Sequence, residues 1–254
     1  MNENVSLVYL SSPALSGCRK SQDCERAGME QYAVALEMGP KRRVFAQVLA
    51  WIGWCRAGKD EMTALNQLVT TASNYAQVVE RAGLTFVTPS SIEAFKIVES
   101  MPGTATTDFG APSVLLTSDR EPLEEEDIER HISLLTACWS TFDDVLHRIP
   151  ADLHDVKPER GRSPSAMRLH LLETEQMHLS AFGPAFRQPD PAHMAEQEAA
   201  VREQFLAELR AVARKESFAP RRSYGFAWTP RFAVRRSAWH ALDHAWELQE
   251  RLDR

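Results

Sequence analysis

The stretch Trp239-His-Ala-Leu-Asp-His-Ala-Trp-Glu247 lies in the last of four long helices that the sequence predicts. Thr229-Pro230 supplies a capping residue and a first helical residue, so this helix is expected from about 230 to 252. His240 and His244 stand four residues apart and therefore share one face of the helix. Two such imidazoles can converge on one metal ion, and the alternative is a pair of solvated histidines.

Three more amphipathic segments precede this helix, and the four together predict an antiparallel helical bundle. The first is expected from about 124 to 148, with four acidic residues in its first turn, where the helix dipole favours negative charge. Ser163-Pro164 opens the second, which is expected to end near Gly183. The third is expected from about 193 to 216.

The sequence of the N-terminal half of the chain predicts a domain with both strands and a helix, an α+β arrangement. Two β-prone runs, 32–37 and 43–50, are separated by Gly39-Pro40, which is typical of a hairpin. A helix is expected over 62–81 and a strand over 94–99, followed by a loop rich in Gly, Pro and Thr. We therefore expect a loosely ordered tail at 1–28, an α+β domain with its linker at 29–118, and an all-α four-helix bundle at 119–254.

Composition narrows the classes of function. The chain has 254 residues, of which 44% are hydrophobic and 25% charged, as in a soluble globular protein. The formal net charge of -6 gives no positive field for a nucleic acid, so none is expected as a partner. No apolar run reaches the roughly 18 residues of a membrane span, and the start lacks a basic signal-peptide region. We expect a cytoplasmic protein whose four scattered cysteines stay reduced.

The second predicted helix carries two histidines that could complete a metal site. His170 could supply a third ligand from a facing helix, and three protein ligands leave one position open for water or substrate. His178 is the competitor, eight residues or about 800° of helical rotation further on. The two rings therefore point roughly 80° apart and cannot easily share one ion.

A four-helix bundle with a histidine in its second helix and H-x-x-x-H in its fourth resembles the DinB/YfiT-like superfamily, here over about residues 120 to 254. The segment His170-Leu-Leu-Glu-Thr-Glu175 matches the pattern H-[LIV]-x-x-x-E that is typical of that second helix. The resemblance implies that His170, His240 and His244 bind a divalent metal ion, usually nickel or zinc. It also implies transferase or isomerase chemistry that depends on a low-molecular-weight thiol, or amide hydrolysis, on a small-molecule substrate.

Residues 29 to about 105 resemble a HicB-like domain, in which two strands and a glycine-containing turn lead into a helix. The segment from Gly53 to Leu65 has the two glycines and the Ala-Leu of that pattern, but Lys59-Asp60 replace its usual hydroxyl residue. No DNA-binding element follows, so a binding or packing role is implied. The rival hypothesis is thus a non-enzymatic partner-binding protein with a structural metal or none. Bundles of this kind often pair, so a homodimer is also considered.

One basic residue is a candidate for binding substrate. Arg236 lies one turn before His240 and could hold an anionic group beside the metal. The alternative is a solvated basic face, because several arginines cluster near the start of the fourth helix. They are Arg221, Arg222, Arg231 and Arg235. The aromatic stretch 224–228 could cap the mouth of the site or simply pack in a loop.

Three acidic residues are candidates for supporting roles at the site. Asp243 and Glu247 could orient the rings of the metal-binding histidines, with plain surface charges as the alternative. Glu175 and Asp243 are candidates for a general base, a role that only geometry can assign.

Overall fold

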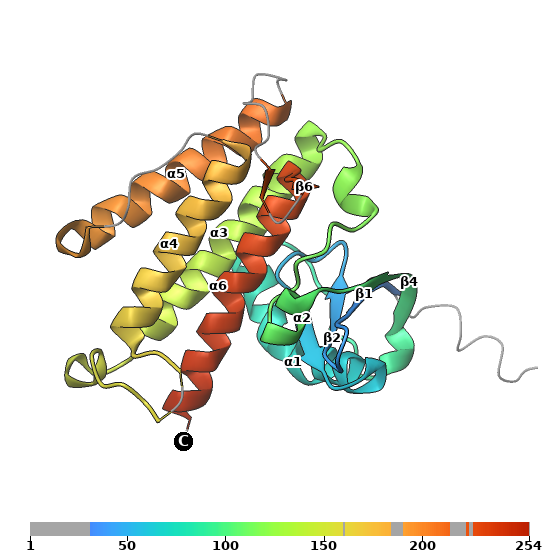
Figure 1. Ribbon diagram of the computed structural model, residues 1–254, viewed down its shortest axis with the longest axis horizontal. Helices are drawn as coiled ribbons and strands as arrows, with labels where there is room; N and C mark the ends of the chain where they lie inside the picture. Colours follow the sequence, from blue (N-terminus) through green and yellow to red (C-terminus); the bar gives the residue numbers. More distant parts are fainter. Residues whose placement is uncertain (1–30, 160, 184–189, 214–221, 224–225, 254) are drawn as a thin grey trace, which may run out of the picture. The chain divides into compact units, whose positions relative to one another are not determined.

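The computed structural model describes residues 31–159, 161–183, 190–213, 222–223 and 226–253 (Figure 1). A mixed four-stranded sheet is combined there with long helices, so the fold is α+β. Residues 31–254 form one compact unit. The expected tail at 1–28, the end of the third predicted helix, and Arg221 all lie outside the described residues.

The sheet has the strand order β3-β2-β1-β4. Its strands are β1 (Tyr32–Met38), β2 (Val44–Val48), β3 (Cys55–Gly58) and β4 (Phe95–Pro102). β1 and β2 are antiparallel with Leu36 opposite Ala46, which confirms the predicted hairpin, whereas β4 runs parallel to β1. The sequence does not predict β3, because four residues that end in glycine carry little β propensity.

Helix α1 (Glu61–Arg81) covers one face of the sheet, where it contacts β2 and β3. Its first turn is capped by Asp60, whose side chain accepts a hydrogen bond from the backbone N–H of Thr63 at 2.8 Å. Between helix and sheet the rings of Trp54 and Tyr75 stack with their centroids 5.2 Å apart. The predicted helix over 62–81 is confirmed.

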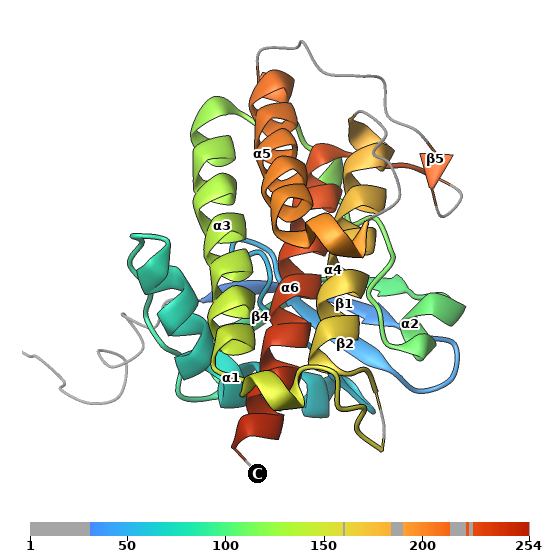
Figure 2. The same cartoon turned by 90° about the vertical axis from the view of Figure 1, so that its left-hand side faces the viewer.

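The long helices are α3 (Glu125–His147), α4 (Pro164–Phe182), α5 (Met194–Ala213) and α6 (Pro230–Leu252). α6 contacts α3 and α4, and α5 contacts the same two helices. Figures 1 and 2 show α6 between the sheet on one side and the other long helices on the other. All four predicted helices are present. Their described ends lie within three residues of the expected ones.

Shorter elements join these layers. The segment expected as a loop contains α2 (Ala105–Phe109), a five-residue helix with a capping box between Thr104 and Thr107. The expectation of a plain loop is therefore wrong for α2, which is too short to show helical periodicity. The remaining short elements are the 3-10 helices Ile92–Ala94, Ser118–Arg120, Ala151–Leu153 and Pro191–His193, and the paired strands β5 (Arg222–Ser223) and β6 (Phe226–Ala227).

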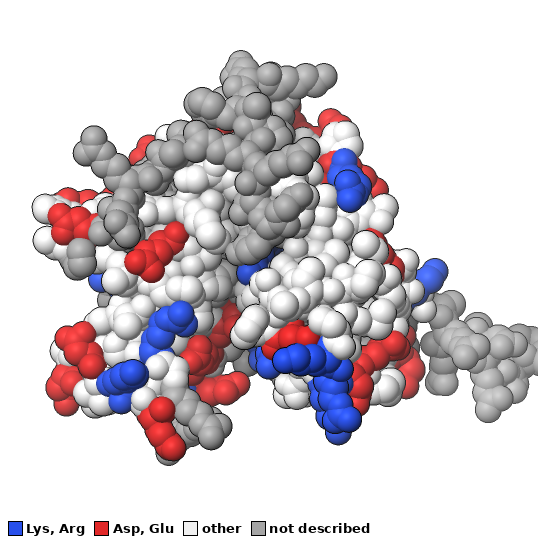
Figure 3. Space-filling model, in the orientation of Figure 1, with Lys and Arg blue, Asp and Glu red and all other residues white. Residues whose placement is uncertain are grey.

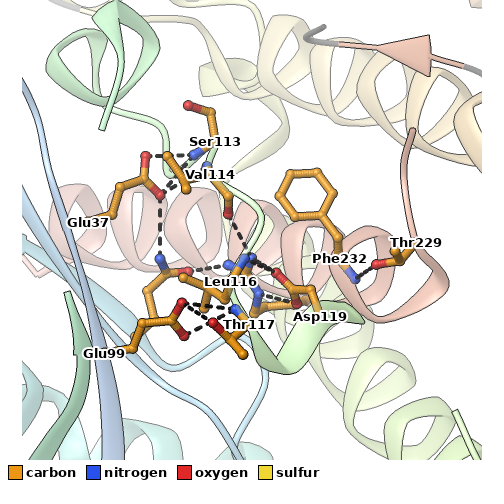
Figure 4. A network of polar contacts seen from close by, with 11 residues as sticks. Glu37, Glu99, Ser113, Val114, Leu116, Thr117, Asp119, Thr229 and Phe232 are labelled. Atoms are coloured by element: carbon orange, nitrogen blue, oxygen red, sulfur yellow. Dashed lines mark hydrogen bonds and ion pairs between the residues drawn. The ribbon is translucent and has the colours of Figure 1, made fainter. Parts of the chain in front are cut away.

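Buried polar groups tie the segment 103–119 to the second face of the sheet (Figure 4). Glu37 is 0% exposed, and its carboxylate accepts hydrogen bonds from the backbone N–H groups of Ser113 and Val114 at 2.8 and 3.2 Å. From α6, Arg235 donates to Asp119 at 3.0 Å and also to the side chain of Gln47 on β2. The backbone N–H groups of Ser113 and Val114 and the buried charges of Glu37, Asp119 and Arg235 thus all have hydrogen-bond partners. Buried polar groups without such partners would destabilise the fold.

The hydrophobic core runs without a break from the sheet into the helices. Its buried members include Val34 and Leu36 on β1, and Leu134 and Leu242 on the long helices. The hydrophobic core continues across the predicted boundary at 118/119. Among the described residues, no helix combines the length and the apolar composition needed to cross a bilayer.

Candidate metal centre

The three histidines predicted as metal ligands lie together between α4 and α6. His240 and His244 occupy successive turns of α6, and His170 approaches from α4, which packs alongside (Figure 2). Nε2 of His240 lies 3.2 Å from Nε2 of His170 and 3.1 Å from Nε2 of His244. One ligand atom from each residue lies within 4.8 Å of the others. The structure thus brings the predicted trio to one point.

Local sequence sets the position and rotation of both helices. Ser163 caps α4 and Thr229 caps α6, each through its side-chain oxygen and each followed by a proline in the first turn, as predicted. Next to the histidines, Leu171 on α4 and Leu242 on α6 are fully buried in the core. Because these neighbours face the core, the rotation of each helix turns its histidines toward the facing helix.

Burial favours the neutral form of two of the three imidazoles, those of His170 and His240. His240 and His244 are 7% and 8% exposed, and His170 is half-buried. Burial lowers the pKa of His170 to about 4, helped by the nearby positive charge of Arg162. Burial likewise lowers the pKa of His240 well below its usual range. Neutral imidazole is the form that binds metal, so His170 and His240 could bind an ion without first releasing a proton.

The spacing of the nitrogen atoms is compatible with a shared metal ion as well as with hydrogen bonds between the rings. Nδ1 of His244 lies 3.2 Å from Oε2 of Glu247, and donation to that carboxylate leaves only a lone pair on Nε2. That lone pair faces Nε2 of His240 at 3.1 Å. Two histidine nitrogens bound to zinc at about 2.0–2.1 Å in a tetrahedral arrangement lie roughly 3.3–3.4 Å apart, close to the spacing found here.

Glu247 is the carboxylate that supports the cluster, as one of the two predicted candidates. The hydrogen bond from His244 lowers the pKa of Glu247, which is also paired with Arg251 on the next turn of α6. Arg251 in turn donates to the backbone carbonyl of Arg162 at 2.7 Å, just before α4 begins. The sequence analysis does not single out Arg251, although its spacing from Glu247 is that of a helical ion pair.

The two candidates for a general base lie apart from this contact. Asp243 forms an ion pair with Arg56 of β3 at 3.5 Å. Glu175 forms an ion pair with Arg202 of α5 at 3.5 Å and is 1% exposed. Five residues separate Glu175 from His170, which turns it about 140° around α4 and away from α6. The prediction that Glu175 serves the histidines as a base is therefore not supported by its position.

His178 does not join the three clustered histidines. It is fully buried, and its Nδ1 lies 2.8 Å from Oγ of Ser237 on α6. Its ring centroid lies 6.2 Å from that of His240. This placement agrees with the helical argument that His170 and His178 point in different directions.

The arginines near the start of α6 have separate environments. Arg236 is buried, and its guanidinium lies over the ring of Trp239 with 4.7 Å between Cζ and the centroid. Arg235 is buried against Asp119, and Arg231 pairs with Asp127. The alternative of a solvated basic face is wrong for Arg235 and Arg236. On the face shown in Figure 3, the basic side chains lie in small groups among acidic and uncharged ones.

A groove of about 760 Å³ lies elsewhere, between α1, α3 and α6. Trp246 and Gln249 line it from α6, whereas His240 and His244 lie against His170 of α4. Its walls are joined by the ion pair between Arg81 and Asp144 at 2.5 Å. The groove and the histidine cluster are thus separate features of α6.

Comparisons with known proteins give no independent assignment. No protein-family model, no curated protein and no solved structure matches this chain. Conclusions about its function accordingly rest on the geometry of the histidine cluster.

Proposed function

We propose that the protein is a divalent-metal protein of the DinB/YfiT-like kind in which His170, His240 and His244 hold one nickel or zinc ion. The observation that carries this proposal is the convergence of three Nε2 atoms from two helices, with contacts of 3.1 and 3.2 Å. Imidazole nitrogen suits both metals. Three protein ligands with one position left open are typical of catalytic zinc sites, whereas structural sites are closed by four.

The proposed activity is that of a thiol-dependent transferase or a hydrolase acting on a small molecule. When bound, the ion would lower the pKa of water or a thiol and so supply a nucleophile near neutral pH. Glu247 would orient His244 and fix its tautomer. The positive charges of Arg162 and Arg236, which act on His170 and His240, favour a substrate or thiol that carries negative charge nearby.

Metal binding by purified protein tests this proposal. We expect one divalent ion per chain by elemental analysis and a 1:1 titration with zinc in calorimetry. Alanine variants of the three histidines should each lower zinc affinity by more than about 100-fold. Removing a residue that only hydrogen-bonds to a ligand typically costs about 10–100-fold. His147→Ala, an exposed histidine on α3, is the matched control. Zinc binding that is absent in the wild type, or unchanged by His240→Ala, would refute the proposal.

A non-enzymatic HicB-like partner-binding role is the second candidate, and one feature of the sheet favours it. β4 forms one edge of the described sheet, and its residues Ile97 and Val98 are exposed. Strand edges with exposed apolar side chains can pair with an added strand. The ladder between β4 and β1 has a bulge at Val98, between the paired residues Ile97 and Glu99. Such a bulge makes the free edge of β4 less suited to pairing with an added strand. Capture of a small partner by wild type and not by Val98→Lys would support this second role.

A further inference from the structure

His178 is a buried titratable group that the proposed metal site does not use. Its ring is 0% exposed and lies 5.1 Å from the ring of Trp228 and 6.2 Å from that of His240, centroid to centroid. A buried imidazole costs free energy unless its nitrogens are hydrogen-bonded, whereas leucine at this position would pack against Trp228 without that cost. Packing alone therefore does not explain the residue.

The hydrogen bonds around His178 connect it with the helix that carries two of the ligands. Nδ1 of His178 lies 2.8 Å from Oγ of Ser237, three residues before His240 on α6. Within the part of the chain that the structure describes, Nε2 of His178 and Nδ1 of His240 are both buried without a hydrogen-bond partner. Two neighbouring imidazoles thus each have one nitrogen unsatisfied.

The chemistry of the two rings makes these nitrogens complementary. A neutral histidine that offers the lone pair of Nε2 to a metal carries its hydrogen on Nδ1, so Nδ1 of His240 becomes a donor. If Nδ1 of His178 donates to Ser237, its Nε2 is an acceptor. One ring then needs an acceptor and the other needs a donor, in the same buried region of α4 and α6.

We propose that His178 is a positioning residue for His240. Ser237 fixes His178 with its hydrogen on Nδ1, and Nε2 of His178 accepts the Nδ1 hydrogen of His240 through one bridging water. At 6.2 Å between the ring centroids the two nitrogens are too far apart for a direct hydrogen bond, so the proposed contact needs a bridging water. This arrangement keeps the Nε2 lone pair of His240 directed at His170 and His244. The inference rests on the proposed metal function for its consequence, and it also predicts the tautomer of His178 in the metal-free protein.

The tautomers of the metal-free protein provide the first test. In protein labelled with ¹⁵N at histidine, long-range nitrogen–proton correlations distinguish a hydrogen on Nδ1 from one on Nε2. We expect the Nδ1–H form for His178 in the wild type. Ser237→Ala should shift His178 toward a mixture of tautomers. A wild-type His178 with its hydrogen on Nε2 would overturn the proposal.

Cobalt affinity, measured by competition with a chelator, provides the second test. His178→Leu and Ser237→Ala should both weaken cobalt binding, the former by about 10–100-fold, the range for outer-shell partners of metal-bound histidine. His178→Gln, which keeps a polar acceptor in place of the ring, should lose less. His131→Leu removes another buried histidine, on α3, and should bind cobalt within twofold of wild type. Affinity within twofold of wild type in His178→Leu would overturn the proposal.

The two tests separate this inference from the proposed function. Should His178→Leu fail to fold, Ser237→Ala decides the cobalt test, because it removes a single hydroxyl from a helix. If the wild type binds no cobalt, the proposed metal function fails, and the tautomer of His178 decides the inference alone. If the wild type binds cobalt tightly and both variants match it, the metal function stands and the role of His178 is refuted.

Discussion

Replacing Glu175 by glutamine is expected to stabilise the protein above pH 7 and to change its stability little near pH 5. Glu175 is enclosed between α4 and α5, and among the described residues its carboxylate has only one ion contact, with Arg202 at 3.5 Å. Arg202 is itself paired more closely with Asp143, at 2.6 Å. Burial therefore dominates and raises the pKa of Glu175 from 4.5 to about 7.

The sign and size of the effect follow from linkage between proton binding and folding. The folded protein holds the proton of Glu175 more tightly than the unfolded chain, so stability falls as the pH rises from about 4.5 through 7. At about 1.4 kcal/mol per tenfold change, the full cost above pH 7 is on the order of 3 kcal/mol. Glutamine stays neutral but gives up the contact with Arg202, so we expect a gain of about 1–3 kcal/mol at pH 8.

Urea unfolding followed by circular dichroism at pH 5 and pH 8 measures this difference. Glu173→Gln is the matched control, because Glu173 is exposed on the same helix. Zinc affinity of Glu175→Gln should equal that of wild type, since Glu175 faces away from the histidine cluster. A gain in unfolding free energy that is equal at both pH values, or absent at pH 8, would refute the assignment of Glu175 as a buried, poorly paired carboxyl.

Three further substitutions test other parts of the structure. Arg235→Met should lower the free energy of unfolding by about 3–5 kcal/mol, because it leaves Asp119 buried without its cation; an unfolding free energy unchanged in urea would contradict this. Glu247→Gln should weaken zinc binding about 10-fold in calorimetry while the Tm of the metal-free protein stays the same; equal affinity would exclude its orienting role. Gly53→Ala should lower Tm, with a cost of about 1–3 kcal/mol, because Gly53 has φ +87° and a Cβ there would lie 2.9 Å from Leu242; an unchanged Tm would show that the neighbours yield.

Local signals in the sequence predicted the helices well. Ser163-Pro164 and Thr229-Pro230 mark the starts of α4 and α6, because capping depends on residues within one turn. The sequence does not predict β3 or α2, because both elements are short. Each is only four or five residues long and is stabilised by partners elsewhere in the chain, such as Val44 opposite Gly58. Periodicity cannot identify elements of that length.

The candidate site divides in a similar way. The shared face of His240 and His244 follows from their spacing, whereas the approach of His170 depends on how α4 packs on α6. The helix pattern offered both His170 and His178, and the family resemblance selected His170. The position of Glu175 could have been worked out from the helical rotation that separates it from His170. The burial of Arg235 could not, because its partner Asp119 lies 116 residues away in the sequence. Contacts of that range follow from the fold alone.

X-ray absorption at the metal edge of zinc-loaded protein tests the central claim most directly. If His170, His240 and His244 hold the ion, the spectrum should require three imidazole nitrogens at about 2.0–2.1 Å and one further light atom. The outer-ring scattering of the imidazoles should fall by about a third in His170→Ala, which removes one of three ligands. A spectrum that requires sulfur ligands, or only water oxygens without imidazole scattering, would contradict the three-histidine site.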